Sequence, residues 1–273
     1  MRHFLACCLL GLNLLGLSVA AQSVEMVKIP AGKFLMGCSQ NDRECEQDEG
    51  KPGGTNVYVP AFYIDRYEVS VAEYRACVRA GKCALPKTYA RNKYCNYDAA
   101  GRDRFPVNCV DWPDAANFCA KQGKRLPLEA EWEKAARAGS NASYSGGAAP
   151  SCRQAILNDG KTQGTVRGEL DGCGEDRTWA VGTRPPNAYG LYDMFGNVSE
   201  WVQNWFHPNA LQSYANGELT APHTGQRKVI RGGAWDESRV ALRSSSRYAK
   251  VPVSGEKVWG SNGFRCAKDA ALN

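Results

Sequence analysis

The cysteines constrain this chain more than any other feature of its sequence. There are 12 of them among 273 residues, and two, Cys7 and Cys8, lie within the first 21 residues. The other ten are even in number and include no C-x-x-C pair. Because only His207 and His223 are available beyond residue 21, a zinc site is poorly supplied with ligands, and disulfides are the favoured interpretation.

The spacing of the ten cysteines suggests which of them pair. Closeness along the chain suggests the local pairs Cys38–Cys45, Cys77–Cys83, Cys95–Cys109 and Cys152–Cys173. Cys119 and Cys266 remain, and a bond between them would join an early helix to the C-terminal end. In the entropic account, a disulfide that closes such a long loop lowers the conformational entropy of the unfolded chain most. The sequence alone does not prove this connectivity.

Residues 1–21 have the features of a secretory signal peptide. Arg2 supplies a basic start, residues 4–17 form an apolar run, and residues 19–21 are small. The run is shorter than the ~20 residues that span a bilayer, and Asn13 interrupts it. We therefore expect cleavage, export to the periplasm or beyond, and a mature chain without a transmembrane anchor.

The charges give no sign of a nucleic-acid partner. The chain has 34 basic and 28 acidic residues, for a formal net charge of +6. The two signs are interspersed, and no basic stripe follows any segment. Nucleic acid is therefore not expected as a partner, and an exported peptide or protein is. The sequence does not indicate an oligomeric state.

The rest of the chain predicts short elements separated by turns. The three predicted helices run from a Ser70–Glu73 capping box to about Arg79, from Asp111 to Gly123, and across residues 126–139. Strands are expected in 26–37, as two short strands around a turn, and in 57–67. Residues 38–56 are predicted to form a surface loop, 139–181 to be mostly loop, and 216–217 to form a turn. This pattern favours one α+β domain over residues 22–273.

The segment from Asn187 to Trp201 is rich in oxygen donors near glycine turns. Asp193 and Glu200 could place two carboxylates on one hard cation, with backbone carbonyls between them completing the shell. The alternative is an Asx turn at Asn197 with Glu200 merely solvated. Spacing alone does not decide between them.

Several motifs in order along the chain resemble the formylglycine-generating enzymes, also called sulfatase-modifying factors. The segments that carry the resemblance are 26–37, 123–133, 187–201, 231–233 and 263–267. The resemblance covers nearly all of the chain after residue 21. It implies a C-type-lectin-like α+β fold that is poor in regular structure and stapled by disulfides.

The resemblance also implies particular site residues. It supports the Cys119–Cys266 disulfide. It further implies a calcium ion held by the side chains of Asp193 and Glu200 and by the carbonyls of Gly196 and Val198.

The family's activity does not carry over with the fold. Formylglycine-generating enzymes oxidise a substrate cysteine with copper(I) held by two thiolates, which are the soft ligands this ion prefers. The matching positions here are Glu237 and Leu242. The family's serine after Gly-Gly is Ala234, and its tryptophan before the calcium-binding glutamate is Ser199. We therefore expect no copper and no thiol-based generation of formylglycine.

The pocket that the resemblance implies keeps several candidate residues. Its expected members are Ser199, Trp201, Arg231, Ala234, Trp235, Glu237, Leu242 and Arg243. Asp236 and Glu237 are the catalytic candidates, as an acid–base pair or as hard-metal ligands. The alternatives are a solvated loop, or ion pairing of these acids with Arg231, Arg239 or Arg243. Trp235 fits a pocket floor or the core equally well, and Arg243 and Arg247 favour ion pairing over anion binding.

Two functions remain open from the sequence. The first is an exported, calcium-binding member of this family that binds a peptide, protein or other ligand in a regulatory or maturation role. The second is an active oxidase or modifying enzyme of exported peptides with non-thiol chemistry. One branch resembling the family, which matures a siderophore chromophore, is exported and lacks the paired thiols.

Overall fold

The computed structural model describes residues 25–86, 92–160, 172–253 and 260–271. The expected signal peptide lies outside these residues, as does part of the loop expected over 139–181. No helix among the described residues is both long enough and apolar enough to cross a membrane.

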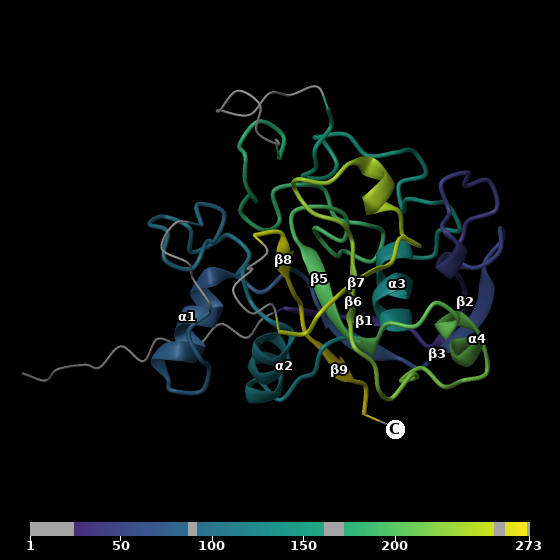
Figure 1. Ribbon diagram of the computed structural model, residues 1–273, viewed down its shortest axis with the longest axis horizontal. Coiled ribbons are helices and arrows are strands. Elements are labelled where there is room, and N and C mark those ends of the chain that lie inside the picture. Colours follow the sequence, from purple (N-terminus) through teal and green to yellow (C-terminus); the bar gives the residue numbers. More distant parts are fainter. Residues whose placement is uncertain (1–24, 87–91, 161–171, 254–259, 272–273) are drawn as a thin grey trace, which may run out of the picture.

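Within the described residues, nine short strands form three small sheets (Figure 1). The first sheet has the order β1 (Met26–Ile29), β4 (Phe62–Asp65), β9 (Ala267–Asp269), and it is antiparallel. The second pairs β2 (Gly32–Met36) with β3 (Thr55–Val59). The third has the order β7 (Tyr248–Lys250), β6 (Lys228–Arg231), β5 (Ser199–Trp205), β8 (Asn262–Gly263). In it only β5 and β8 are parallel.

The two strands expected within residues 26–37 form, but they do not pair with each other. Pro30 separates them, and each takes its partner from the segment 55–65. The single strand expected over 57–67 is correspondingly two strands, β3 and β4.

Four α-helices and two short 3₁₀ helices complete the described elements. They are α1 (Val71–Arg79), α2 (Trp112–Lys121), α3 (Glu129–Arg137), α4 (Ala210–Ala215), η1 (Gln47–Glu49) and η2 (Arg239–Leu242). The expected capping box at α1 is present, since Ser70 Oγ accepts from the Glu73 N–H and Glu73 Oε2 accepts from the Ser70 N–H. The Asn216-Gly217 turn ends α4.

The start of α2 agrees with the sequence prediction, and the start of α3 differs from it. Asp111 occupies the N-cap of α2, but its side chain makes no capping hydrogen bond there. Helix α3 begins at Glu129, after the predicted residue 126. Leu128 at its N-cap has no acceptor to offer, and the Glu131 carboxylate accepts from the Leu128 N–H at 2.8 Å instead. One half of a capping box is therefore enough to start this helix.

Residues 38–56 are not simply the surface loop expected from their polarity. They contain η1, and Cys38 and Glu49 are fully buried. Glu49 is buried because it forms an ion pair with Arg243, which lies 194 residues further along the chain. The segment is therefore folded into the body of the molecule.

Helix α3 lies at the centre of the packing and is buried along its whole length. It contacts β2, β3, β5 and β6, and Trp132 on α3 belongs to the main hydrophobic core (Figure 1). A second core gathers α1 and α2 around Phe118 and Phe264.

All five expected disulfides are present: Cys38–Cys45, Cys77–Cys83, Cys95–Cys109, Cys119–Cys266 and Cys152–Cys173. The Cys119–Cys266 bond spans 147 residues and ties α2 to the segment between β8 and β9.

Candidate functional site

The loop that follows β6 is folded back onto η2 by two glycines. Gly232 and Gly233 have φ values of 95° and 69°, in a region that favours glycine. A Cβ at Gly233 would lie 2.6 Å from the Leu242 side chain. Leu242 itself is fully buried with Ala155 and Leu157, so it belongs to the core and lines no site.

Glu237 reaches back from this loop to the four-stranded sheet. Its Oε2 accepts the Ala234 N–H at 3.0 Å and faces the Ser199 hydroxyl at 3.5 Å. Ser199 on β5 is the register partner of Asn262 on β8. Asn262 Oδ1 in turn accepts from the Lys250 ammonium at 2.7 Å. Three strands and one loop therefore bring a carboxylate, a hydroxyl, an amide and an ammonium together.

The surroundings shift the proton affinities of this cluster. Burial, and then the neighbouring charge of Asp236, raise the pKa of Glu237, and Lys250 partly opposes this rise. Burial lowers the pKa of Lys250, while the two acids oppose that change. The acid and the amine thus approach each other in proton affinity, which is typical of groups that exchange protons.

The residues just before Glu237 leave two polar atoms unpaired. The Trp235 indole N–H and Asp236 Oδ1 are buried without a hydrogen-bond partner in the described part of the chain. Trp235 packs on Tyr94 with ring centroids 5.2 Å apart. Burial raises the pKa of Asp236 as well.

The buried arginines of this stretch pair elsewhere. Arg231 forms an ion pair with Glu133 and donates to the carbonyls of Ser244, Ser245 and Ser246. Arg243 makes two hydrogen bonds to the Glu49 carboxylate, at 2.6 and 2.7 Å. The alternative that Asp236 and Glu237 are the partners of these two arginines is therefore wrong.

Arg247 completes the set of buried ion pairs. Its guanidinium contacts both oxygens of Glu129, at 2.6 and 2.9 Å. Ion pairing of Arg243 and Arg247 agrees with the sequence prediction, and both arginines hold the fold.

The residues predicted to line the pocket therefore fall into two groups, those near Glu237 and those that belong to the core or to buried ion pairs. Ser199 and Glu237 come together in the cluster. Trp201 lies in the core, where its indole N–H donates to the Val110 carbonyl at 2.9 Å. Ala234 and Trp235 are also buried, next to the cluster. Sequence reasoning missed Lys250 and Asn262, because only strand pairing brings them to the site and neither lies in a motif.

The residues expected to bind calcium form a second, fully buried cluster. Glu200 is completely buried, so the alternative that it is merely solvated is wrong. Its two oxygens accept from the Arg265 guanidinium and from the Trp132 indole N–H. Asp193 Oδ2 accepts the Gly182 N–H at 2.6 Å. Sequence reasoning missed Arg265 as a member of this cluster.

A third carboxylate, Glu68, lies in the same cluster. It accepts from the Asn197 amide and from the Val198 N–H. Burial, and then the charges of Asp193 and Glu200, raise the pKa of Glu68 well above its ordinary value. Burial raises the pKa of Asp193 to about 6. The cluster thus holds more carboxylates than Arg265 alone can balance.

This donor set suits a hard divalent cation in charge and in chemistry. Calcium prefers carboxylate and carbonyl oxygens, and two further positive charges would balance the cluster. Glu200 would have to exchange one hydrogen bond for the ion, because both of its oxygens already accept. No group of three or more His, Cys, Asp or Glu side chains in the described residues is arranged to hold a metal. A calcium ion would therefore depend on the carbonyls of Gly196 and Val198.

Comparisons with known proteins agree with this architecture, which is the C-type-lectin-like α+β fold of the formylglycine-generating enzymes. The "Sulfatase-modifying factor enzyme 1-like domain" family model matches residues 16–270. The chain is 37% identical to a formylglycine-generating enzyme of Streptomyces coelicolor, with 90% of each chain covered. It therefore belongs to the formylglycine-generating-enzyme (sulfatase-modifying factor) family.

Two further proteins are similar to this chain over most of its length. The structure of PvdO from Pseudomonas aeruginosa is similar, with a TM-score of 0.70 and 31% identity over 90% of this chain and 94% of that one. The mouse protein named inactive C-alpha-formylglycine-generating enzyme 2 is 28% identical over 92% of this chain and 87% of its own length. In this chain all ten cysteines of the described residues belong to disulfides.

Proposed function

We propose that this chain is an exported maturation enzyme that transfers protons on a bound peptide at Glu237 and Lys250, without thiolates or copper. The observation that carries the proposal is the cluster in which Glu237, from the loop after β6, lies near Ser199, Lys250 and Asn262 of the four-stranded sheet. A binding platform does not need a buried acid of raised pKa near a buried amine of lowered pKa, whereas such shifts favour proton transfer. This favours the second of the two functions left open by the sequence.

Each group of the cluster has a defined part in that chemistry. The Glu237 carboxylate accepts a proton from an O–H or N–H group of the substrate. The Lys250 ammonium stabilises the negative charge that remains, and Asn262 holds the ammonium in place. The N–H of Ala234 fixes Glu237 by its Oε2 atom, which leaves Oε1 for the substrate.

The test compares the exported peptides of cells that carry the wild-type chain or Glu237→Gln. We expect a peptide whose mass or chromatographic retention differs between the two strains, and we expect the variant to match a strain without the protein. The control is Glu175→Gln, because Glu175 forms a half-exposed ion pair with Arg177. Identical masses and retention times of all exported peptides in the wild-type and Glu237→Gln strains would contradict the proposal.

We further propose that calcium binds at Asp193, Gly196, Val198 and Glu200. When bound, it would supply the positive charge that the three carboxylates lack and stiffen the segment that ends at Ser199. Equilibrium dialysis with metal analysis should show one calcium per chain, with affinity lowered about tenfold or more by Asp193→Asn. Exposed Glu46, changed to Gln, is the control. Equal affinity in the wild type and Asp193→Asn would exclude this site.

Export to the periplasm or the cell exterior is part of the same proposal. Five disulfides are the pattern of an oxidising compartment, and the first 21 residues supply a signal. Cell fractionation with N-terminal sequencing should find the chain outside the cytoplasm and starting near residue 22. An intact N-terminus in the cytoplasmic fraction would overturn this part.

A further inference from the structure

The disulfide Cys38–Cys45 lies beside a buried guanidinium. Arg137 donates to the carbonyl of Gly37 and, at 3.3 Å, to the hydroxyl of Ser39, so it spans both neighbours of Cys38. Its carboxylate partner, Glu133, also pairs with Arg231. One carboxylate thus serves two guanidiniums, and the Arg137 guanidinium lies beside the chain on both sides of Cys38.

The two sulfurs of this disulfide differ in access. Cys38 has no exposed surface, whereas Cys45 is half-buried. A cavity of about 150 Å³ lies next to Cys38 and is also lined by Ser39 and Arg137. An incoming thiolate therefore meets Cys45, and Cys38 becomes the leaving group. A nearby cation stabilises a thiolate, and a more stable thiolate leaves faster.

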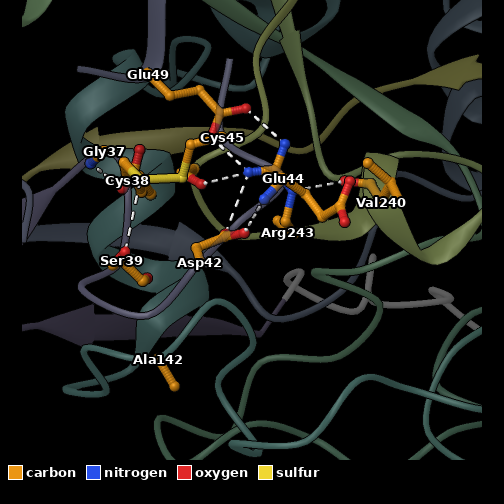
Figure 2. Close-up of a disulfide and its surroundings, with 12 residues drawn as sticks. Gly37, Cys38, Ser39, Asp42, Glu44, Cys45, Glu49, Ala142, Val240 and Arg243 are labelled. Carbon is orange, nitrogen blue, oxygen red and sulfur yellow. Dashed lines mark hydrogen bonds and ion pairs between the residues drawn. A yellow bond between two sulfur atoms is a disulfide. The ribbon is translucent and has the colours of Figure 1, made fainter. Parts of the chain in front are cut away.

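The same disulfide holds the acids that neutralise Arg243. Asp42 lies inside the loop that the disulfide closes and contacts Arg243 at 3.2 Å. Glu49 follows four residues after Cys45, and its carbonyl accepts the Cys38 N–H at 2.8 Å. Figure 2 shows both carboxylates directed at the Arg243 guanidinium beside the disulfide. Arg243 directly follows η2, which begins two residues after Glu237.

We infer that Cys38–Cys45 is a thiol–disulfide exchange site for a dithiol reductant, and that opening it loosens η2. A thiolate of the reductant attacks the Cys45 sulfur and forms a mixed disulfide, while the Cys38–Cys45 bond breaks and Cys38 leaves as a thiolate. The second thiol of the reductant then resolves the mixed disulfide. The reductant ends as a disulfide, and its two protons reside on Cys38 and Cys45.

Opening the bond has a structural consequence for the segment after Glu237. The loop that carries Asp42 loses its closure, and Arg243 loses the fixed position of its partners. A buried guanidinium whose partners move is costly, so η2 gains freedom. This inference does not depend on the chemistry proposed for Glu237, because its two tests measure only the reduction of disulfides and the exchange of backbone amide hydrogens.

The first experiment is graded reduction of the intact protein with dithiothreitol, followed by alkylation and peptide mass spectrometry. Cys77–Cys83 is the matched control, because its sequence separation is 6 against 7 for Cys38–Cys45. We expect Cys38 and Cys45 to be alkylated at dithiothreitol concentrations at least about tenfold lower than Cys77 and Cys83, because Cys45 is accessible to the reductant and the Arg137 guanidinium lies beside the leaving Cys38 sulfur. Simultaneous opening, or earlier opening of Cys77–Cys83, would overturn the inference.

The second experiment measures amide hydrogen exchange of residues 236–246. We expect faster exchange in the double variant Cys38→Ser with Cys45→Ser and no change in Cys77→Ser with Cys83→Ser. Partially reduced wild type provides the same comparison without substitutions. Unchanged exchange at η2 after Cys38–Cys45 opens, or an equal increase in the control, would show that the disulfide does not hold η2.

Discussion

The buried arginines and the Glu237 cluster come from one stretch of sequence but are built in opposite ways. Arg231, Arg243 and Arg247 each have a buried carboxylate partner and further hydrogen bonds. Around Glu237, the Trp235 indole N–H and Asp236 Oδ1 are buried without a hydrogen-bond partner in the described residues, and the pKa values of Glu237, Asp236 and Lys250 are shifted. Buried ion pairs hold the fold, whereas shifted proton affinities are typical of groups that act on a ligand.

The largest expected effect comes from breaking the paired region at Glu133. Glu133→Gln removes the only carboxylate that pairs with Arg137 in the described residues and leaves Arg231 with Glu129 at 3.6 Å alone. We expect a loss of about 3–5 kcal/mol in the free energy of unfolding, measured with urea. Glu175→Gln, at a half-exposed pair, should change it by less than about 1 kcal/mol. Similar losses in the two variants would remove the distinction between buried and exposed pairs.

A smaller effect is expected from Arg243→Lys. The substitution keeps the charge but cannot reproduce the two parallel hydrogen bonds to Glu49. We expect a loss of about 1.5–3 kcal/mol, the range for hydrogen bonds to charged groups. The change should leave calcium affinity unaltered, because Arg243 makes no contact with the Asp193 cluster. Unchanged stability of the lysine variant would mean that a positive charge is enough to stabilise buried Glu49, without the two parallel hydrogen bonds of a guanidinium.

The smallest effect, and one of opposite sign, is expected from Glu237→Gln. Burial raises the pKa of this carboxyl in the folded chain, so its contribution to stability is present at acidic pH and is lost as pH rises through the raised value. Glutamine does not ionise and avoids that loss. The variant should therefore gain stability relative to wild type between pH 4 and pH 8, as measured by urea unfolding at both values. If the variant instead lost stability relative to wild type as pH rises from 4 to 8, Glu237 would be a carboxylate that stabilises the fold, as the partners of the buried arginines do.

Local features were predictable from the sequence, and long-range pairings were not. The capping box at Ser70 and the four short-range disulfides depend on residues close together in the chain, where spacing carries the information. The fifth, Cys119–Cys266, followed because no other cysteine was left and the family resemblance supported it.

The predictions that failed depended on partners far away in sequence. Glu49 appeared to belong to a solvated loop, because nothing near it reveals Arg243. Lys250 and Asn262 were missed for the same reason, since β7 and β8 reach the site only through the strand order of the third sheet. A polar residue in a loop-rich fold cannot be assigned to surface or interior until its counterion is known.

Residues 262–269 have a consequence for how this chain is made. They supply β8 to one sheet and β9 to another, and between the two strands lie Arg265, the partner of Glu200, and Cys266, the partner of Cys119. Both sheets, a buried ion pair and the longest disulfide-closed loop of the described residues therefore need residues 262–269. Folding during synthesis must stay incomplete until these residues are available to pair.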